Sequence, residues 1–161
     1  MLAYRMPRDP SNPRVALWRK LRRLGAIQLV DGLVALPAAA HTIEQFDWLA
    51  EEVTEAGGEA TTWIARATSA GQERMVARRM ADAAAQEYRA VATEASAALE
   101  ATPAASKRVL ARLRRELRRI AVRDHFPPAE REEAHRKVRE LAESVGAGGK
   151  PLADLRQETA R

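Results

Sequence analysis

The fold is decided by residues 4–67, which read YRMPRDPSNPRVALWRKLRRLGAIQLVDGLVALPAAAHTIEQFDWLAEEVTEAGGEATTWIARA. A short apolar entry is followed by a helical pattern, two β-prone runs, a second helical pattern and one more β-prone run. This order, β-α-β-β-α-β, is the split βαβ pattern of ferredoxin-like domains. The sequence therefore predicts an α+β fold, with a ferredoxin-like βαββαβ domain over residues 1–67 and a helical extension after it.

The first helix is expected over residues 14–24. Pro7, Pro10 and Pro13 precede it, and proline is tolerated at the start of a helix but not in its interior. Gly25 is expected to be its C-cap, since helices often end at a glycine in the left-handed conformation. The apolar face of this helix is predicted to consist of Val15, Leu17, Trp18, Leu21 and Leu24.

Turn and cap signals place the remaining elements of this domain. Asp31-Gly32 between residues 26–30 and 33–36 predicts a hairpin with a type I′ turn, which needs positive φ at both central positions. Thr42 and Gln45 fit a capping box at the start of the second helix. Gly57-Gly58 ends that helix, and residues 60–65 are β-favouring.

Residues 70–145 show only helical periodicity. One helix is predicted over 70–101 and is broken by Pro103; a second over 104–123 and a third after Pro127-Pro128 follow. Residues 146–161 are Gly-rich and aperiodic, which indicates a flexible tail. The predicted core stripes comprise Val76, Met80, Ala84, Tyr88, Val91, Ala95 and Leu99, then Leu110, Leu113, Leu117 and Ile120, then Ala134, Val138, Leu141 and Val145.

Composition narrows the class of protein. The 161 residues include no cysteine, which excludes disulfides and thiolate metal sites and is typical of a reducing compartment. No stretch reaches the roughly 18 apolar residues of a membrane span. We therefore expect a cytoplasmic protein without membrane association. The net charge of +5 and the sequence pI of about 10.2 favour polyanionic partners.

The predicted helix over 14–24 carries a basic face. Arg19, Lys20, Arg22 and Arg23 form it, and they are our candidate nucleic-acid contacts because guanidinium and ammonium groups bind backbone phosphates. The competing interpretation is a solvated face that pairs with the acidic second helix or with a neighbouring subunit.

A longer basic row is predicted on the helix over 104–123, where Glu116 is the only acid. Like charges four residues apart cost about 0.2–0.5 kcal/mol each, so such a row needs compensation. An external polyanion could supply it, because the row extends over ~22 Å. Alternatively, Glu130, Glu132, Glu133, Glu140 and Glu143 could fold back onto it. The candidate oxyanion or phosphate contacts are Arg108, Arg112, Arg115, Arg119 and Arg123.

Catalytic and metal-binding patterns are absent from the sequence. His41, His125 and His135 lack the spacing of a metal pair and fit ordinary surface histidines, and there is no Gly-rich phosphate loop or nucleophile elbow. We therefore expect no enzyme activity, no metal and no cofactor.

Several segments together resemble the N-terminal domain of the chromate-resistance protein ChrB, a bacterial regulator family. The resemblance covers about residues 4–141 and is most specific over 13–37. The matching segments are Tyr4-Arg5-Met6-Pro7, residues 13–21 (PRVALWRKL), Leu24-Gly25, residues 29–37 (LVDGLVALP), residues 48–52 (WLAEE), Gly57-Gly58, Glu87-Tyr88, Arg119-Ile120 and Arg123-Asp124-His125-Phe126, where His125 replaces an aromatic residue of the family.

The resemblance implies a non-catalytic regulator of chromate efflux that binds promoter DNA, with chromate as a further candidate ligand and a homodimer as the expected assembly. Longer family members carry a second domain, and if that domain senses the oxyanion, this chain binds DNA or a partner without responding to chromate. A structural homo-oligomeric module that does not bind nucleic acid is the alternative. A metal-dependent nuclease is disfavoured, because Tyr4, Arg5 and Met6 stand where such a site needs an acid.

Overall fold

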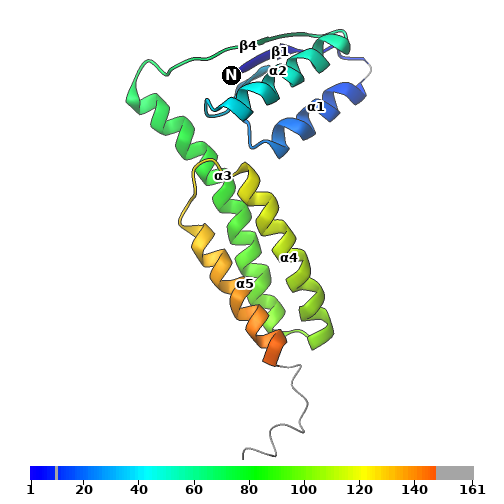
Figure 1. The fold of residues 1–161 in the computed structure, drawn as a ribbon, viewed down its shortest axis with the longest axis vertical. Coiled ribbons are helices and arrows are strands. Elements are labelled where there is room, and N and C mark those ends of the chain that lie inside the picture. The colour runs from blue at the N-terminus through cyan, green and yellow to red at the C-terminus, as the bar shows by residue number, and fades with distance from the viewer. Residues whose placement is uncertain (10, 148–161) are drawn as a thin grey trace, which may run out of the picture. The chain divides into compact units, whose positions relative to one another are not determined.

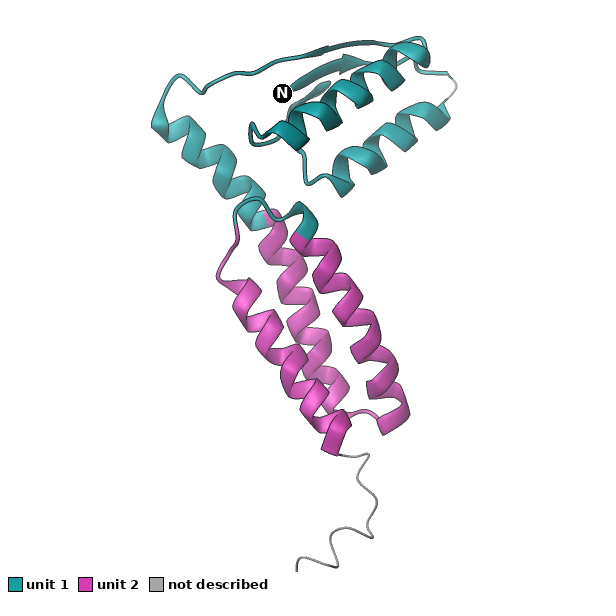
Figure 2. Cartoon of the chain, viewed as in Figure 1, with its two compact units in different colours: residues 1–82, 122–126 teal, residues 83–121, 127–161 magenta. Residues whose placement is uncertain are grey.

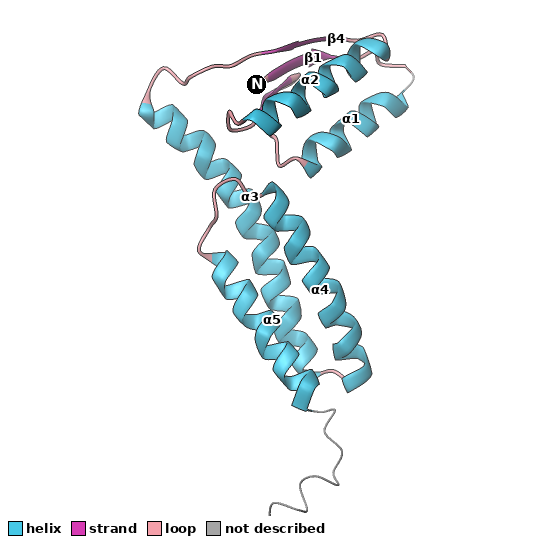
Figure 3. Cartoon of the chain, viewed as in Figure 1, coloured by secondary structure: helices cyan, strands magenta, loops and turns pink. Residues whose placement is uncertain are grey.

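The computed structural model describes residues 1–9 and 11–147 (Figure 1). It forms two compact units (Figure 2): unit 1 contains Met1–Asp82 and Val122–Phe126, and unit 2 contains Ala83–Ala121 and the chain from Pro127 onward. Strands occur only in the first part of the described chain and helices in both units, so the α+β class is confirmed (Figure 3). Of the predicted tail, Gly146 and Ala147 belong to the last helix, and 148–161 lie outside the described residues.

Unit 1 contains a four-stranded sheet made of β1 (Leu2–Arg5), β2 (Ile27–Val30), β3 (Leu33–Ala35) and β4 (Glu59–Thr62). The strand order is β2-β3-β1-β4, and each neighbouring pair is antiparallel. Leu2 is paired with Val34 on one side and with Thr62 on the other. Because residues paired across neighbouring strands point to the same face of a sheet, Leu2 and Val34 are buried on one face.

Helices α1 (Ser11–Arg23) and α2 (Ala40–Glu55) lie on that face (Figure 1). They pack on it through Leu17 and Leu21 of α1 and Phe46, Leu49 and Val53 of α2. The wider apolar face predicted for α1 is wrong at two positions. Val15 is 42% exposed and Trp18 is 51% exposed, since the core takes only the one α1 residue per turn that points at the sheet.

Gly25 ends α1 as predicted. Its φ is +73°, its N–H donates to the carbonyl of Arg22 at 3.2 Å, and the N–H of Ala26 donates to the carbonyl of Leu21 at 3.0 Å. These two bonds form the Schellman pattern that satisfies the last carbonyls of a helix. The same pattern ends α2 at Gly57, whose φ is +77°.

The predicted capping box of α2 is misplaced. The helix begins at Ala40, so Thr42 lies inside its first turn rather than at the N-cap. The buried Thr42 hydroxyl donates to the carbonyl of Pro37 at 2.6 Å and accepts from the N–H of Ala39 at 3.0 Å. Thr42 is therefore the third residue (N3) of a capping box whose N-cap is Ala39. Its hydroxyl connects the start of α2 to the preceding loop by hydrogen bonds.

The predicted hairpin forms, but its turn is not type I′. Gly32 has φ +73°, whereas Asp31 does not have positive φ, and the β2–β3 register shifts between Gln28 and Val30. The bulge supplies the twist that a type I′ turn would have supplied. The last strand is also shorter than predicted and ends at Thr62. The next residue, Trp63, forms backbone hydrogen bonds with Met1 in both directions.

Unit 2 is a bundle of the C-terminal part of α3 (Ala70–Ala97), the short 3₁₀ helix η1 (Ala98–Glu100), α4 (Pro103–Arg123) and α5 (Glu130–Ala147). The predicted stripes are buried except at three positions: Val76 and Val145 are half-buried, and Leu99 is exposed because the chain leaves the α-helical register and buries Ala98 instead. Val76 and Met80, at the start of the first stripe, belong to unit 1. The buried core consists of Ala84, Tyr88, Val91, Ala95, Ala98, Leu110, Leu113, Leu117, Ile120, Ala134, Val138 and Leu141.

Candidate functional site

The basic face of α1 is only partly engaged by the rest of unit 1. Lys20 Nζ lies 2.5 Å from Oε2 of Glu52 on α2, so the fold already uses this charge. The guanidinium carbon of Arg22 lies 4.9 Å from the centre of the Trp18 ring, a cation–π contact. Within the described chain, Arg19 and Arg23 have no ion pair, and both are exposed. Within the predicted basic face, these two guanidinium groups are therefore accessible to an outside anion.

The α4 row divides into three groups. Arg108 and Arg115 are exposed and have no ion pair among residues 1–9 and 11–147. Arg112 pairs with Glu94 of α3, and Arg119 Nη1 lies 3.3 Å from Oε2 of Glu116. Arg123 is half-buried and belongs to unit 1. The row that was predicted as five equivalent charges therefore holds two exposed arginines without an internal carboxylate.

Three carboxylates of α5 pair with residues outside the α4 row. Glu130 Oε1 lies 2.5 Å from Nη1 of Arg89 on α3. Glu133 and Glu140 both bind Arg136 of their own helix. The hydrogen bond from Lys137 and the nearby charge of Arg136 lower the pKa of Glu140. Glu130, Glu133 and Glu140 therefore pair with Arg89 and Arg136, and no ion pair joins them to Arg108 or Arg115 in the described chain.

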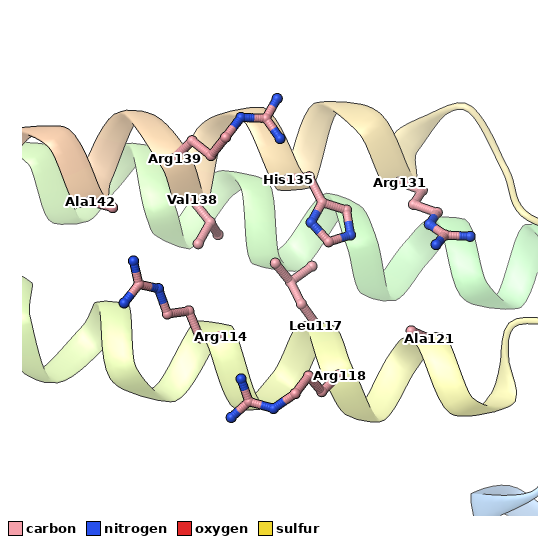
Figure 4. Close-up of a pocket in the computed structure, with 9 residues that line it drawn as sticks. All are labelled: Arg114, Leu117, Arg118, Ala121, Arg131, His135, Val138, Arg139 and Ala142. Atoms are coloured by element: carbon pink, nitrogen blue, oxygen red, sulfur yellow. The ribbon is translucent and has the colours of Figure 1, made fainter.

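A groove between α4 and α5 collects a second set of cations within unit 2 (Figure 4). Its volume is about 410 Å³. Leu117 of α4 and Val138 of α5 point into the space between the two helices (Figure 4). The lining residues are Arg114, Leu117, Arg118 and Ala121 from α4 and Arg131, His135, Val138, Arg139 and Ala142 from α5.

Sequence reasoning missed this groove. Arg114 and Arg118 were not among the candidate contacts on the helix over 104–123, and His135 fitted an ordinary surface histidine. A signal was present, because Arg131, His135 and Arg139 recur every fourth residue and therefore share one face of α5. The missing information was that this face borders the Arg114 side of α4, which no local pattern states.

His125 has a structural contact. Its Nε2 lies 2.8 Å from the carbonyl oxygen of Leu24, directly after α1. A carbonyl can only accept, so Nε2 carries the proton. The backbone of the neighbouring Arg123 packs against Gly25. These contacts attach the 122–126 segment to the end of α1 and leave His125 a role in packing.

Metal and membrane signals are lacking in the described part of the chain. No group of three or more histidine or acidic side chains there could hold a metal ion. Among the described helices, none combines the length and the apolar character needed to cross a bilayer.

One family model matches this sequence. It is described as "Protein ChrB, N-terminal", and it matches residues 14–148, which include α1, the β2–β3 hairpin, α2 and the helices of unit 2. Comparison with curated proteins and with solved structures gives no match. Because the matched region covers most of the 161 residues, this chain belongs to the ChrB family through its N-terminal domain.

Proposed function

We propose that this protein is a non-catalytic regulator in chromate resistance that binds promoter DNA in the cytoplasm through α1. Membership of the ChrB family supports the pathway. The observation that carries DNA binding is the contrast on α1: Lys20 is paired with Glu52, whereas Arg19 and Arg23 are exposed without an ion pair in the described chain. Such arginines suit backbone phosphates, which position a protein on DNA without reading its sequence.

The α4 row is the proposed second contact with phosphate or with chromate itself. Chromate is a tetrahedral dianion, and a guanidinium group can donate two parallel hydrogen bonds to such an oxyanion. Arg108 and Arg115 carry this assignment, since Arg112 and Arg119 already bind carboxylates. Arg123 is a weaker candidate for the oxyanion contact, because it is half-buried beside Gly25.

A ferredoxin-like architecture and a homodimer are part of the same proposal. The element order β-α-β-β-α-β and the antiparallel sheet order β2-β3-β1-β4 support a split βαβ domain. Exposed Trp18 and Trp48, each 51% accessible, supply apolar surface that a second copy could cover.

Promoter-fragment binding measured against salt concentration tests this function. Each lost phosphate contact should reduce the slope of log K against log salt by about 0.9. We expect the double variant Arg19→Gln/Arg23→Gln to lower the slope by about 2 and Lys20→Met to leave it almost unchanged. A wild-type affinity that does not depend on salt, or equal slopes in all three proteins, would overturn the proposal.

The alternative is a structural module that forms a homo-oligomer without binding nucleic acid. The Lys20–Glu52 and Arg112–Glu94 pairs favour it, because they show basic helices of this chain matched by its own acids. It predicts no DNA affinity at moderate salt. It also predicts that Arg19→Glu/Arg23→Glu shifts the oligomer towards monomer in sedimentation velocity measurements.

A further inference from the structure

We propose that the groove between α4 and α5 is a binding site for a chain of linked phosphates, separate from the α1 and α4 contacts assigned above. Its lining provides four arginines, one histidine, two small alanines and two larger apolar residues (Figure 4). No lining residue is acidic. A groove of about 410 Å³ is within the size range of small-ligand sites.

Three of the groove arginines lack an internal carboxylate partner. Arg114, Arg118 and Arg139 have no ion pair within residues 1–9 and 11–147. Arg114 and Arg118 are four residues apart on α4. Like charges at this spacing destabilise a helix by about 0.2–0.5 kcal/mol per pair when the ligand is absent. A bound polyanion would remove this repulsion, so binding should stabilise unit 2.

The spacing of the cations selects an extended anion. Residues four apart on a helix are separated by ~6 Å along its axis, and Arg131 to Arg139 spans ~12 Å. Charges on both walls thus recur along the groove and are not gathered at one point. A single tetrahedral anion can contact one such level, whereas consecutive phosphates can contact several. Guanidinium groups bind each phosphate through paired hydrogen bonds.

The floor of the groove strengthens these contacts. Leu117 and Val138 are buried core residues, and Ala121 and Ala142 leave room beside them. An apolar floor excludes water from one side of a bound phosphate, and a lower local dielectric strengthens its attraction to the arginines. Arg108 and Arg115 do not line this groove with its apolar floor.

The groove and the α4 row occupy different faces of one helix. At 3.6 residues per turn, Arg114 and Arg118 lie on average roughly 90° around the α4 axis from Arg108 and Arg115. The two sets can therefore be changed independently. The double variant Arg74→Gln/Arg78→Gln removes the same number of positive charges from exposed positions of α3 that belong to neither set, and it is the matched control for Arg114→Gln/Arg139→Gln.

Isothermal titration calorimetry of the full chain at about 50 mM salt tests the site, because phosphate contacts are strong at low ionic strength. The probes are tripolyphosphate and a short single-stranded DNA oligonucleotide. We expect the groove variant to bind tripolyphosphate at least about tenfold more weakly and the control variant to bind within about twofold of wild type. Circular dichroism checks that both variants fold.

The two probes separate the sources of the ligand. Tripolyphosphate binding that depends on the groove identifies free phosphate chains, and oligonucleotide binding alone that depends on the groove identifies nucleic acid; both support the site. A shift of the His135 ring proton in NMR spectra places the ligand there. No binding of either probe, or an equal loss in the groove and control variants, overturns the inference, and neither result alters the salt slope that Arg19 and Arg23 are expected to produce.

Discussion

The carbonyl oxygen of Arg123 occupies the space in which a Cβ atom on Gly25 would have to lie. Gly25 also has φ +73°, a conformation that residues with a Cβ rarely adopt. Two residues almost one hundred positions apart in the sequence thus meet backbone to backbone. The Schellman end of α1 and the 122–126 segment of unit 1 depend on this one small residue.

Gly25→Ala should therefore destabilise unit 1 by more than 1 kcal/mol, through about 1–2 kcal/mol for the left-handed backbone and a further cost for displacing Arg123. Urea unfolding followed by tryptophan fluorescence measures it, because Trp18, Trp48 and Trp63 all lie in unit 1. Gly71→Ala in α3 is the matched control, since its Cβ would meet only the Ser69 hydroxyl, at 3.8 Å. Equal effects of the two substitutions would contradict this account.

The His125–Leu24 hydrogen bond should contribute about 0.5–1.5 kcal/mol to the same transition. His125→Ala removes the donor and leaves the Leu24 carbonyl without this partner. The exposed His41 on α2 provides the control substitution His41→Ala, which should change the unfolding midpoint by less than half as much. If both alanine variants unfold at the wild-type midpoint, the contact does not stabilise unit 1.

Thr42→Val tests the start of α2. The substitution keeps the shape of the side chain but removes the hydroxyl that bonds to Pro37 and Ala39, so we expect a loss of about 1–2 kcal/mol. Thr54→Val is the paired control, because its exposed hydroxyl bonds only to the Ala50 carbonyl one turn earlier. Its effect should stay within about 0.5 kcal/mol. Denaturant midpoints that rank the two variants in the opposite order would refute the assignment.

Tyr4 should make the stability of unit 1 depend on pH in the alkaline range. Burial, and secondly the negative charge of Asp31, raise the pKa of the Tyr4 phenol above its ordinary value. Folding therefore favours the neutral phenol. Its stabilising contribution is fully present below about pH 10 and is lost as the pH rises through the folded-state pKa.

We expect Tyr4→Phe to flatten the decline of the unfolding free energy above about pH 10 relative to wild type. Asp31→Asn should flatten it in part, because it removes the smaller of the two causes. Denaturation series at several alkaline pH values provide the comparison. Parallel declines in wild type and Tyr4→Phe would show that another group is responsible.

Local signals in the sequence were sufficient to predict the order of the elements. Gly25 and Gly57-Gly58 mark helix ends because backbone conformation at those positions needs no distant partner. The leucine stripe of α4 likewise predicted its buried face, since periodicity depends on helix geometry alone. Predictions failed where contacts between distant residues decided which side chains are buried. Trp18, for example, is apolar and correctly spaced but lies outside the core.

The sequence by itself determined an α+β chain with a basic α1 and a basic α4, because charge composition and hydrophobic periodicity are local properties of the sequence. Only the tertiary structure decided which of those charges form ion pairs within the chain. It brought Glu52 to Lys20 and Glu94 to Arg112, and it placed Arg114 beside the Arg139 face of α5. Charge pairing acts over a few ångströms in space, so residues far apart in the chain decide it once packing has brought their helices together.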